Sequence, residues 1–184
     1  MAKKRNKSEK NAASPYRWAI TVFFMAVGIS AALSLTSQSL LSGAGIVLAS
    51  GILILFILLG IVFDIIGVAV TAADPKPLHS MASHKVSGAR EALSLLKNAS
   101  RVSSVCNDVV GDICGIVSGV TGAVIVGRLQ TALDTTTILI SVGVTAVISG
   151  LTIGGKALSK TFAIKKGTQV LYWVGRFLHF FHRR

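Results

Sequence analysis

Charged residues are scarce in this sequence, and acidic ones are the scarcest. Only 14% of the 184 residues are charged, and 7 Asp and Glu stand against 19 Lys and Arg. With 52% hydrophobic residues and a mean hydropathy of +0.69, the chain lies far from the composition of a soluble domain. The two cysteines, Cys106 and Cys114, both fall in one apolar stretch, which indicates buried thiols rather than a disulfide framework. One small membrane domain is therefore expected.

The motifs of common catalytic chemistry are also absent. The sequence contains no Cys-x-x-Cys, no His-Glu-x-x-His, no P-loop and no Gly-x-Gly-x-x-Gly. Hydrolysis inside a membrane would need a nucleophile beside a base, and no His or Lys falls within the apolar stretches described next. We therefore expect that the protein is not an enzyme.

Four apolar stretches have the length of membrane helices, since about 20 helical residues cross a ~30 Å hydrocarbon core. They cover approximately residues 18–35, 46–70, 105–127 and 136–155. A polar turn at 36–39 is expected between the first two, and Asp74-Pro75 ends the second. The predicted fold class is an all-α membrane protein with about four transmembrane helices. Its polytopic domain covers 17–160 and follows a basic tail at 1–16.

Two segments outside the spans have amphipathic patterns. In the connector, 74–101, Val86, Ala89, Leu93 and Leu96 recur at helical spacing between charged residues, which predicts a short amphipathic helix. The last segment, 161–184, carries an apolar stripe through Leu171 opposite a basic and aromatic face, a pattern typical of a helix lying in the membrane interface.

The positive charges predict the topology. Eighteen of the 19 Lys and Arg precede the first span, lie between spans two and three, or follow span four, and only Arg128 falls on the other side. The positive-inside rule therefore places a multi-pass protein in the cell membrane with both termini cytoplasmic. The lipid bilayer accounts for most of the basic excess, so no nucleic-acid partner is expected. The first apolar stretch is long for a signal peptide and no clear cleavage site ends it.

Three acids inside the predicted spans need an explanation. An aspartate near the bilayer centre costs about 2.5–3.5 kcal/mol, so such residues usually face another helix or a wet cavity. Gly111, Gly115 and Gly119 repeat every four residues, a pattern that lets helix backbones approach closely, and Asp108 and Asp112 lie beside that face. Carboxylates and an amide suit a hard cation such as Mg²⁺. The candidate cation-binding residues are Asp64, Asn107, Asp108 and Asp112, with Asp108 and Asp112 as the metal ligands.

Simpler interpretations stay open. Asp108 and Asp112 can stabilise the N-terminal end of a helix through its macrodipole. Asp64 can be satisfied by a hydroxyl of a neighbouring helix, and the three glycines can serve packing alone.

Several local motifs in this order resemble the transmembrane domain of the CorB/CorC and cyclin-M magnesium-transport family, over roughly residues 45–182. Phe63–Val70 stands where that family has Phe-x-x-x-Glu-x-Ala-Leu. Gly88–Arg101 is similar to its amphipathic connector, and Asn107 falls where a polar residue follows. Gly155–Lys160 resembles the Gly-Glu-x-x-Pro-Lys that closes its last span. The resemblance implies a core of three spans, Mg²⁺ as the bound or transported ion, and a homodimer.

The departures from the family pattern define two hypotheses. Gly67 and Lys156 replace glutamates, Ser159 replaces a proline, no CBS pair follows, and an additional span precedes the core. The first hypothesis is divalent-cation transport or binding through an acidic intramembrane pocket. The alternative is a membrane interaction or regulatory protein that uses the same fold without transport.

Overall fold

Over the residues that it describes, the structure is an all-α bundle with four helices long and apolar enough to cross a membrane, which confirms the predicted fold class. This computed structural model describes residues 15–43, 45–134 and 138–182, and no strand occurs in those ranges. The basic tail before Pro15 lies outside the described residues. The elements are α1 (Pro15–Leu41), α2 (Ile46–Ala72), α3 (Pro75–Ser83), α4 (Ala89–Lys97), α5 (Ala99–Ser104), the π-helix η3 (Val105–Gly111), α6 (Asp112–Ala132) and α7 (Ile138–His182).

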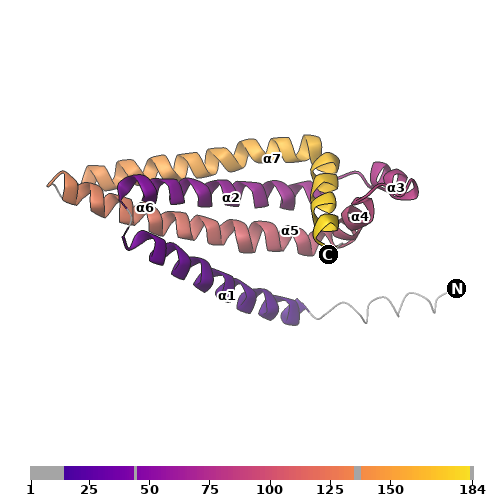
Figure 1. Cartoon of the computed structure of the whole chain (residues 1–184), viewed down its shortest axis with the longest axis horizontal. Coiled ribbons are helices and arrows are strands. Elements are labelled where there is room, and N and C mark those ends of the chain that lie inside the picture. Colours follow the sequence, from indigo (N-terminus) through magenta and orange to yellow (C-terminus); the bar gives the residue numbers. More distant parts are fainter. Residues whose placement is uncertain (1–14, 44, 135–137, 183–184) are drawn as a thin grey trace.

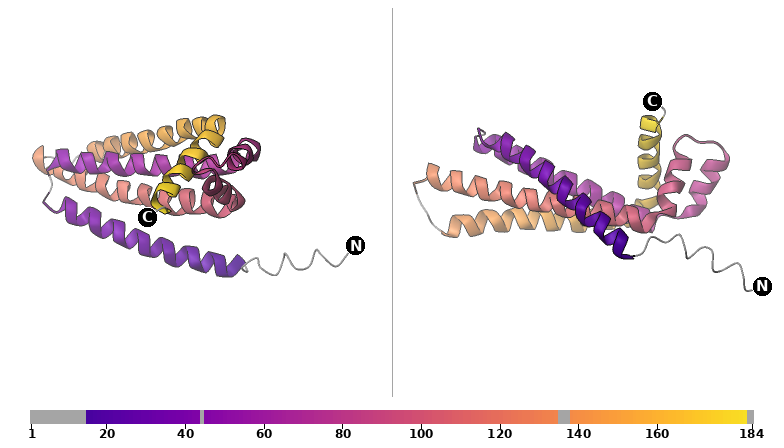
Figure 2. Two further views of the ribbon diagram at one scale, coloured as in Figure 1. Left: turned by 45° about the vertical axis from the view of Figure 1, so that its right-hand side comes forward. Right: turned by 90° about the horizontal axis from the view of Figure 1, so that it is seen from below.

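Three spanning segments form the body of the molecule (Figure 1). They are α2, the continuous run α5–η3–α6, and the first part of α7, and they lie side by side. Helix α1 lies along the outside and diverges from the others toward its start. The last part of α7 turns across one end of the bundle, where α3 and α4 also lie (Figure 2).

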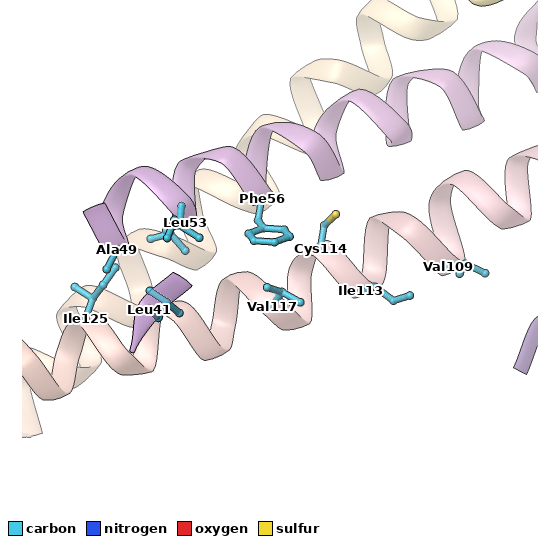
Figure 3. Close-up of a cluster of buried hydrophobic side chains, with 10 residues drawn as sticks. Leu41, Ala49, Leu53, Phe56, Val109, Ile113, Cys114, Val117 and Ile125 are labelled. Carbon is cyan, nitrogen blue, oxygen red and sulfur yellow. The ribbon is translucent and has the colours of Figure 1, made fainter. Parts of the chain in front are cut away.

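The bundle is apolar outside as well as inside, as a membrane helix bundle must be. Large side chains such as Phe24, Leu55 and Leu139 are exposed on its surface. The interior between α2 and α6 is filled by one cluster, in which Phe56 lies near Val117 and Cys114 (Figure 3). A second cluster around Val70, Leu78 and Leu171 joins the end of α2 to the connector and to the C-terminal part of α7.

Local chemistry explains where α2 ends and α7 bends. Pro75 cannot continue α2, and the Asp74 carboxylate caps α3 by accepting a hydrogen bond from the Lys76 N–H at 2.9 Å. In α7 the backbone leaves helical geometry at Lys166 (φ −118°, ψ 18°). Next to it, Gly167 lies so close to α2 that a Cβ would stand 3.1 Å from the Ala69 carbonyl oxygen. The Thr168 hydroxyl accepts a hydrogen bond from the Asp74 N–H at 3.0 Å.

The helices differ from the sequence prediction in four places. The expected turn at 36–39 is helical. The Thr36 hydroxyl donates a hydrogen bond to the Ala32 carbonyl oxygen of the preceding turn at 2.8 Å, so this polar side chain is satisfied within the helix. The connector forms two helices, since Gly88 in a left-handed conformation (φ 87°) separates α4 from α3. The third span begins at Ala99 rather than 105. The C-terminal amphipathic segment continues α7 and bends at Lys166 rather than starting at 161.

Candidate functional site

Asp64 and Lys156 face each other inside the bundle. Asp64 in α2 is 4% exposed, and the Lys156 Nζ atom of α7 lies 3.6 Å from its Oδ2 atom. Each residue follows the first residue of its helix by 18 positions, about 27 Å of α-helix. In a hydrocarbon core of ~30 Å, the pair therefore sits close to the end of the bundle that carries α3, α4 and the C-terminal part of α7.

Gly111 makes room for this pair. A Cβ at position 111 would stand 3.0 Å from Asp64 Oδ1, 3.3 Å from the carbonyl oxygen of Cys106 and 3.7 Å from Lys156 Nζ. A carboxylate, a backbone oxygen and an ammonium thus gather around one buried glycine. A methyl group at 111 would make the Asp64 carboxylate shift by a few tenths of an ångström, and a larger side chain would have to displace the ion pair.

The helix that carries Gly111 is irregular at this point. Residues Val105–Gly111 form a π-helix, in which the backbone hydrogen bonds span five residues instead of four, and such turns occur frequently at functional sites. The π-turn lies between two regular helices of the same span, so it changes which residues before 111 face α2. Sequence periodicity carried no signal for it.

Asn107 lies in this π-turn against α2. Its Nδ2 atom donates a hydrogen bond to Ser103 Oγ at 3.3 Å, whereas Oδ1 is a buried side-chain oxygen with no hydrogen-bond partner among the described residues. The amide packs directly on Gly67, where a Cβ would stand 2.0 Å from Oδ1. Buried polar atoms are normally satisfied, so this oxygen is a candidate ligand.

Asp108 and Asp112 do not join Asp64, contrary to the predicted acidic pocket between the spans. Both are exposed on the outside of η3 and α6. The π-turn shifts the register of Asp108, and Asp112 follows Gly111 directly, so neither faces the side on which Gly111 meets α2. Asp112 lies 20 residues, about 30 Å, from the end of α6 at Ala132, which puts both acids at the edge of the hydrocarbon layer.

The helix-end explanation does not hold for these acids either. The backbone stays in right-handed helical geometry from Ser104 through Asp112, so α5, η3 and α6 form one helix that begins at Ala99. Asp108 is well inside it, beyond the first turn where the macrodipole acts. Across the described residues, no group of three or more His, Cys, Asp or Glu could hold a metal ion.

The glycine pattern is only partly a packing surface. Gly111 is buried at the Asp64–Lys156 pair, but a Cβ on Gly115 or Gly119 would meet nothing within 4 Å. These two instead line a groove of about 560 Å³ between α6 and α7. Close contacts occur at glycines that the pattern did not select: a Cβ on Gly60 would stand 3.2 Å from Cys114 Cβ, and one on Gly155 would stand 2.5 Å from Ile61 Cδ1.

The chain is a multi-pass membrane protein with a buried aspartate, a lysine and a π-turn at the meeting point of three spans. Residues 51–183, most of the chain, match the family described as the cyclin M transmembrane N-terminal domain, and the chain belongs to that family. This confirms the resemblance noted in the sequence. Helix α1 precedes the matched residues. Comparison with curated proteins and with solved structures found no match.

Proposed function

We propose that the protein binds a divalent cation, Mg²⁺ in the first place, where α2, η3 and α7 meet, and moves it across the membrane. The observation that carries this proposal is the buried Asn107 Oδ1 atom, which has no hydrogen-bond partner among the described residues. It belongs to the same π-turn as Gly111, whose built Cβ would lie 3.0 Å from Asp64 Oδ1 and 3.3 Å from the Cys106 carbonyl oxygen. Amide, carbonyl and carboxylate oxygens are the ligands that Mg²⁺ prefers, usually with several of its waters retained.

Family membership supports the same ion class, because this family is associated with divalent-cation transport. Asp108 and Asp112 keep a part in the proposal, but as charges at the edge of the membrane. Exposed carboxylates at the same end of the bundle raise the local concentration of cations without coordinating them directly. Cell-membrane placement, cytoplasmic termini and a homodimer remain predictions that belong to this proposal.

One observation favours the alternative of a membrane interaction or regulatory protein without transport. The Lys156 ammonium already supplies a positive charge beside Asp64, so a carboxylate and an ammonium together leave the site with no net charge. A neutral site attracts a divalent cation less than a site with an unpaired carboxylate. The experiment below separates the two functions.

The test is thermal unfolding of the full chain in detergent, with and without millimolar Mg²⁺, Mn²⁺ or Co²⁺ at matched ionic strength. A ligand at a hundredfold its Kd stabilises the folded state by about 2.7 kcal/mol, so binding raises the unfolding temperature. Asp64→Asn should remove most of this rise, because it removes the carboxylate and keeps its shape. Asp134→Asn, in a loop at the other end of the bundle, is the control and should keep the rise. No response of the wild type to any of the three ions would favour the alternative.

A further inference from the structure

Lys156 does not take the easier route open to a lysine near a membrane edge. A lysine side chain close to the end of a span normally extends toward the headgroups and keeps its ammonium in water. Here the Lys156 side chain turns inward, is 24% exposed, and holds its Nζ atom beside the carboxylate of the buried Asp64 side chain. The buried charge of Asp64 is what draws it in, since an unpaired carboxylate in this position is unfavourable.

The pair is close but not tightly bonded. The 3.6 Å between Nζ and Oδ2 exceeds the 2.7–3.2 Å of an N–H···O hydrogen bond, so the contact is an ion pair without direct hydrogen-bond geometry. The ammonium has no rigid fork of donors to fix it, and its four-carbon stem has several rotamers. It is a positive charge that can leave.

We infer that the Lys156 ammonium occupies the place of the cation at this site and competes with it as a tethered counter-ion. The inference rests on the cation site proposed above. Around Gly111 the ammonium stands with the Asp64 carboxylate and the Cys106 carbonyl oxygen, the oxygen types that a hard cation would take. A divalent cation and an ammonium repel each other at this range. Metal can therefore bind only when Lys156 swings out toward the headgroups, and the lysine sets the affinity of the site.

The first experiment compares the Mg²⁺ concentration that gives half of the maximal thermal stabilisation in four full-length chains. Lys156→Met removes the competing charge and should lower that concentration on the order of tenfold or more. A close positive charge changes the proton affinity of a carboxylate by about one to three pK units, and we expect an effect on its Mg²⁺ affinity in the same range. Lys156→Arg keeps the charge and should not lower it. Lys160→Met, an exposed lysine one turn further along α7, is the matched control and should behave as wild type.

The outcomes separate this inference from the proposed function. A response in Lys156→Met that is tighter than in wild type, or present only in Lys156→Met, supports the competing lysine. The second case also assigns wild type to the non-transporting alternative. Equal half-saturating concentrations in wild type and Lys156→Met would overturn the inference and leave the cation function intact. If neither chain responds to Mg²⁺, Mn²⁺ or Co²⁺, the cation site itself is wrong.

A second measurement needs no variant and covers the case in which Lys156→Met fails to fold. Mg²⁺ binding to wild type should release the Lys156 ammonium toward water. Its modification by an amine-reactive reagent, followed by peptide mass spectrometry, should rise severalfold at saturating Mg²⁺. Lys160 is the internal control and should not change. Reactivity of Lys156 that stays constant or falls while the protein is stabilised by Mg²⁺ would contradict displacement.

Discussion

Single glycines set how closely side chains and helices approach around Asp64. Gly111 leaves room for the ion pair, and Gly67 lies directly under the Asn107 amide. The four-residue spacing predicted equal contact at Gly115 and Gly119, yet both are open. Such a spacing identifies one face of a helix, but the crossing angle of the neighbouring helix decides which part of that face is covered.

Gly67→Ala tests the contact under Asn107. The new Cβ would stand 2.0 Å from Oδ1 and 2.6 Å from Cγ, so the amide must rotate away from Ser103 or the helices must separate. Overpacking of this kind costs about 1–3 kcal/mol, and the unfolding temperature in detergent should fall. Gly115→Ala, with nothing within 4 Å, should keep or raise it. Equal unfolding temperatures for the two variants would contradict the contact.

Residue chemistry alone could identify Asp64 but not its partner. An aspartate in an apolar stretch is conspicuous because its burial is costly. Lys156 falls one residue past the expected end of span four at 155, so the sequence counts it among the basic residues that follow the span, whereas α7 continues well beyond it. The unpartnered Asn107 oxygen depends on the π-turn, which leaves no period in the sequence.

At the scale of elements, α7 combines a span with its C-terminal part after Lys166, which we call the end piece. The sequence predicted these as two separate segments. Apolar periodicity found both parts, but the bend between them comes from contacts with distant residues. Those contacts are the approach of Gly167 to Ala69 and the Asp74–Thr168 hydrogen bond. The end piece then packs on α4 through Gly175, and the His179 Nδ1 atom lies 2.7 Å from Glu91 Oε1.

Gly175→Ala tests how the end piece is held. Its Cβ would stand 2.5 Å from the Gly88 carbonyl oxygen and 2.7 Å from the Ala92 nitrogen, and backbone atoms cannot rotate aside. The end piece should therefore separate from α4, and trypsin should cleave faster after Lys165 and Lys166. Gly154→Ala in the same helix meets nothing within 4 Å and should stabilise the chain by about 0.5–1 kcal/mol. Unchanged cleavage in Gly175→Ala would show that the end piece is held elsewhere.

At the scale of the whole molecule, the two ends of the bundle differ in charge. The start of α1, the connector helices and the end piece of α7 lie at one end (Figure 1), and the connector and end piece there carry Lys76, Lys85, Arg90 and Arg176. At the opposite end, Arg128 donates a hydrogen bond to the Leu41 carbonyl oxygen, which satisfies the last turn of α1. Arg128 thus has a structural role, which explains why a single basic residue stands at the end opposite to the other basic residues. The charge count therefore predicts one orientation, with the basic end in the cytoplasm.

Accessibility of single cysteines in intact cells tests this orientation. The native Cys106 and Cys114 are buried, so they need not be removed first. Ser39, in the last turns of α1, and Ser87, between α3 and α4, are exposed at opposite ends of the bundle. An impermeant thiol reagent should label Ser39→Cys in intact cells and should label Ser87→Cys only after the membrane is opened. The reverse labelling pattern would show the opposite orientation in the membrane. Asp64, Lys156 and the exposed acids Asp108 and Asp112 would then lie near the outer side. Because the site lies near the basic end, the same labelling decides from which compartment a cation first meets Asp108 and Asp112.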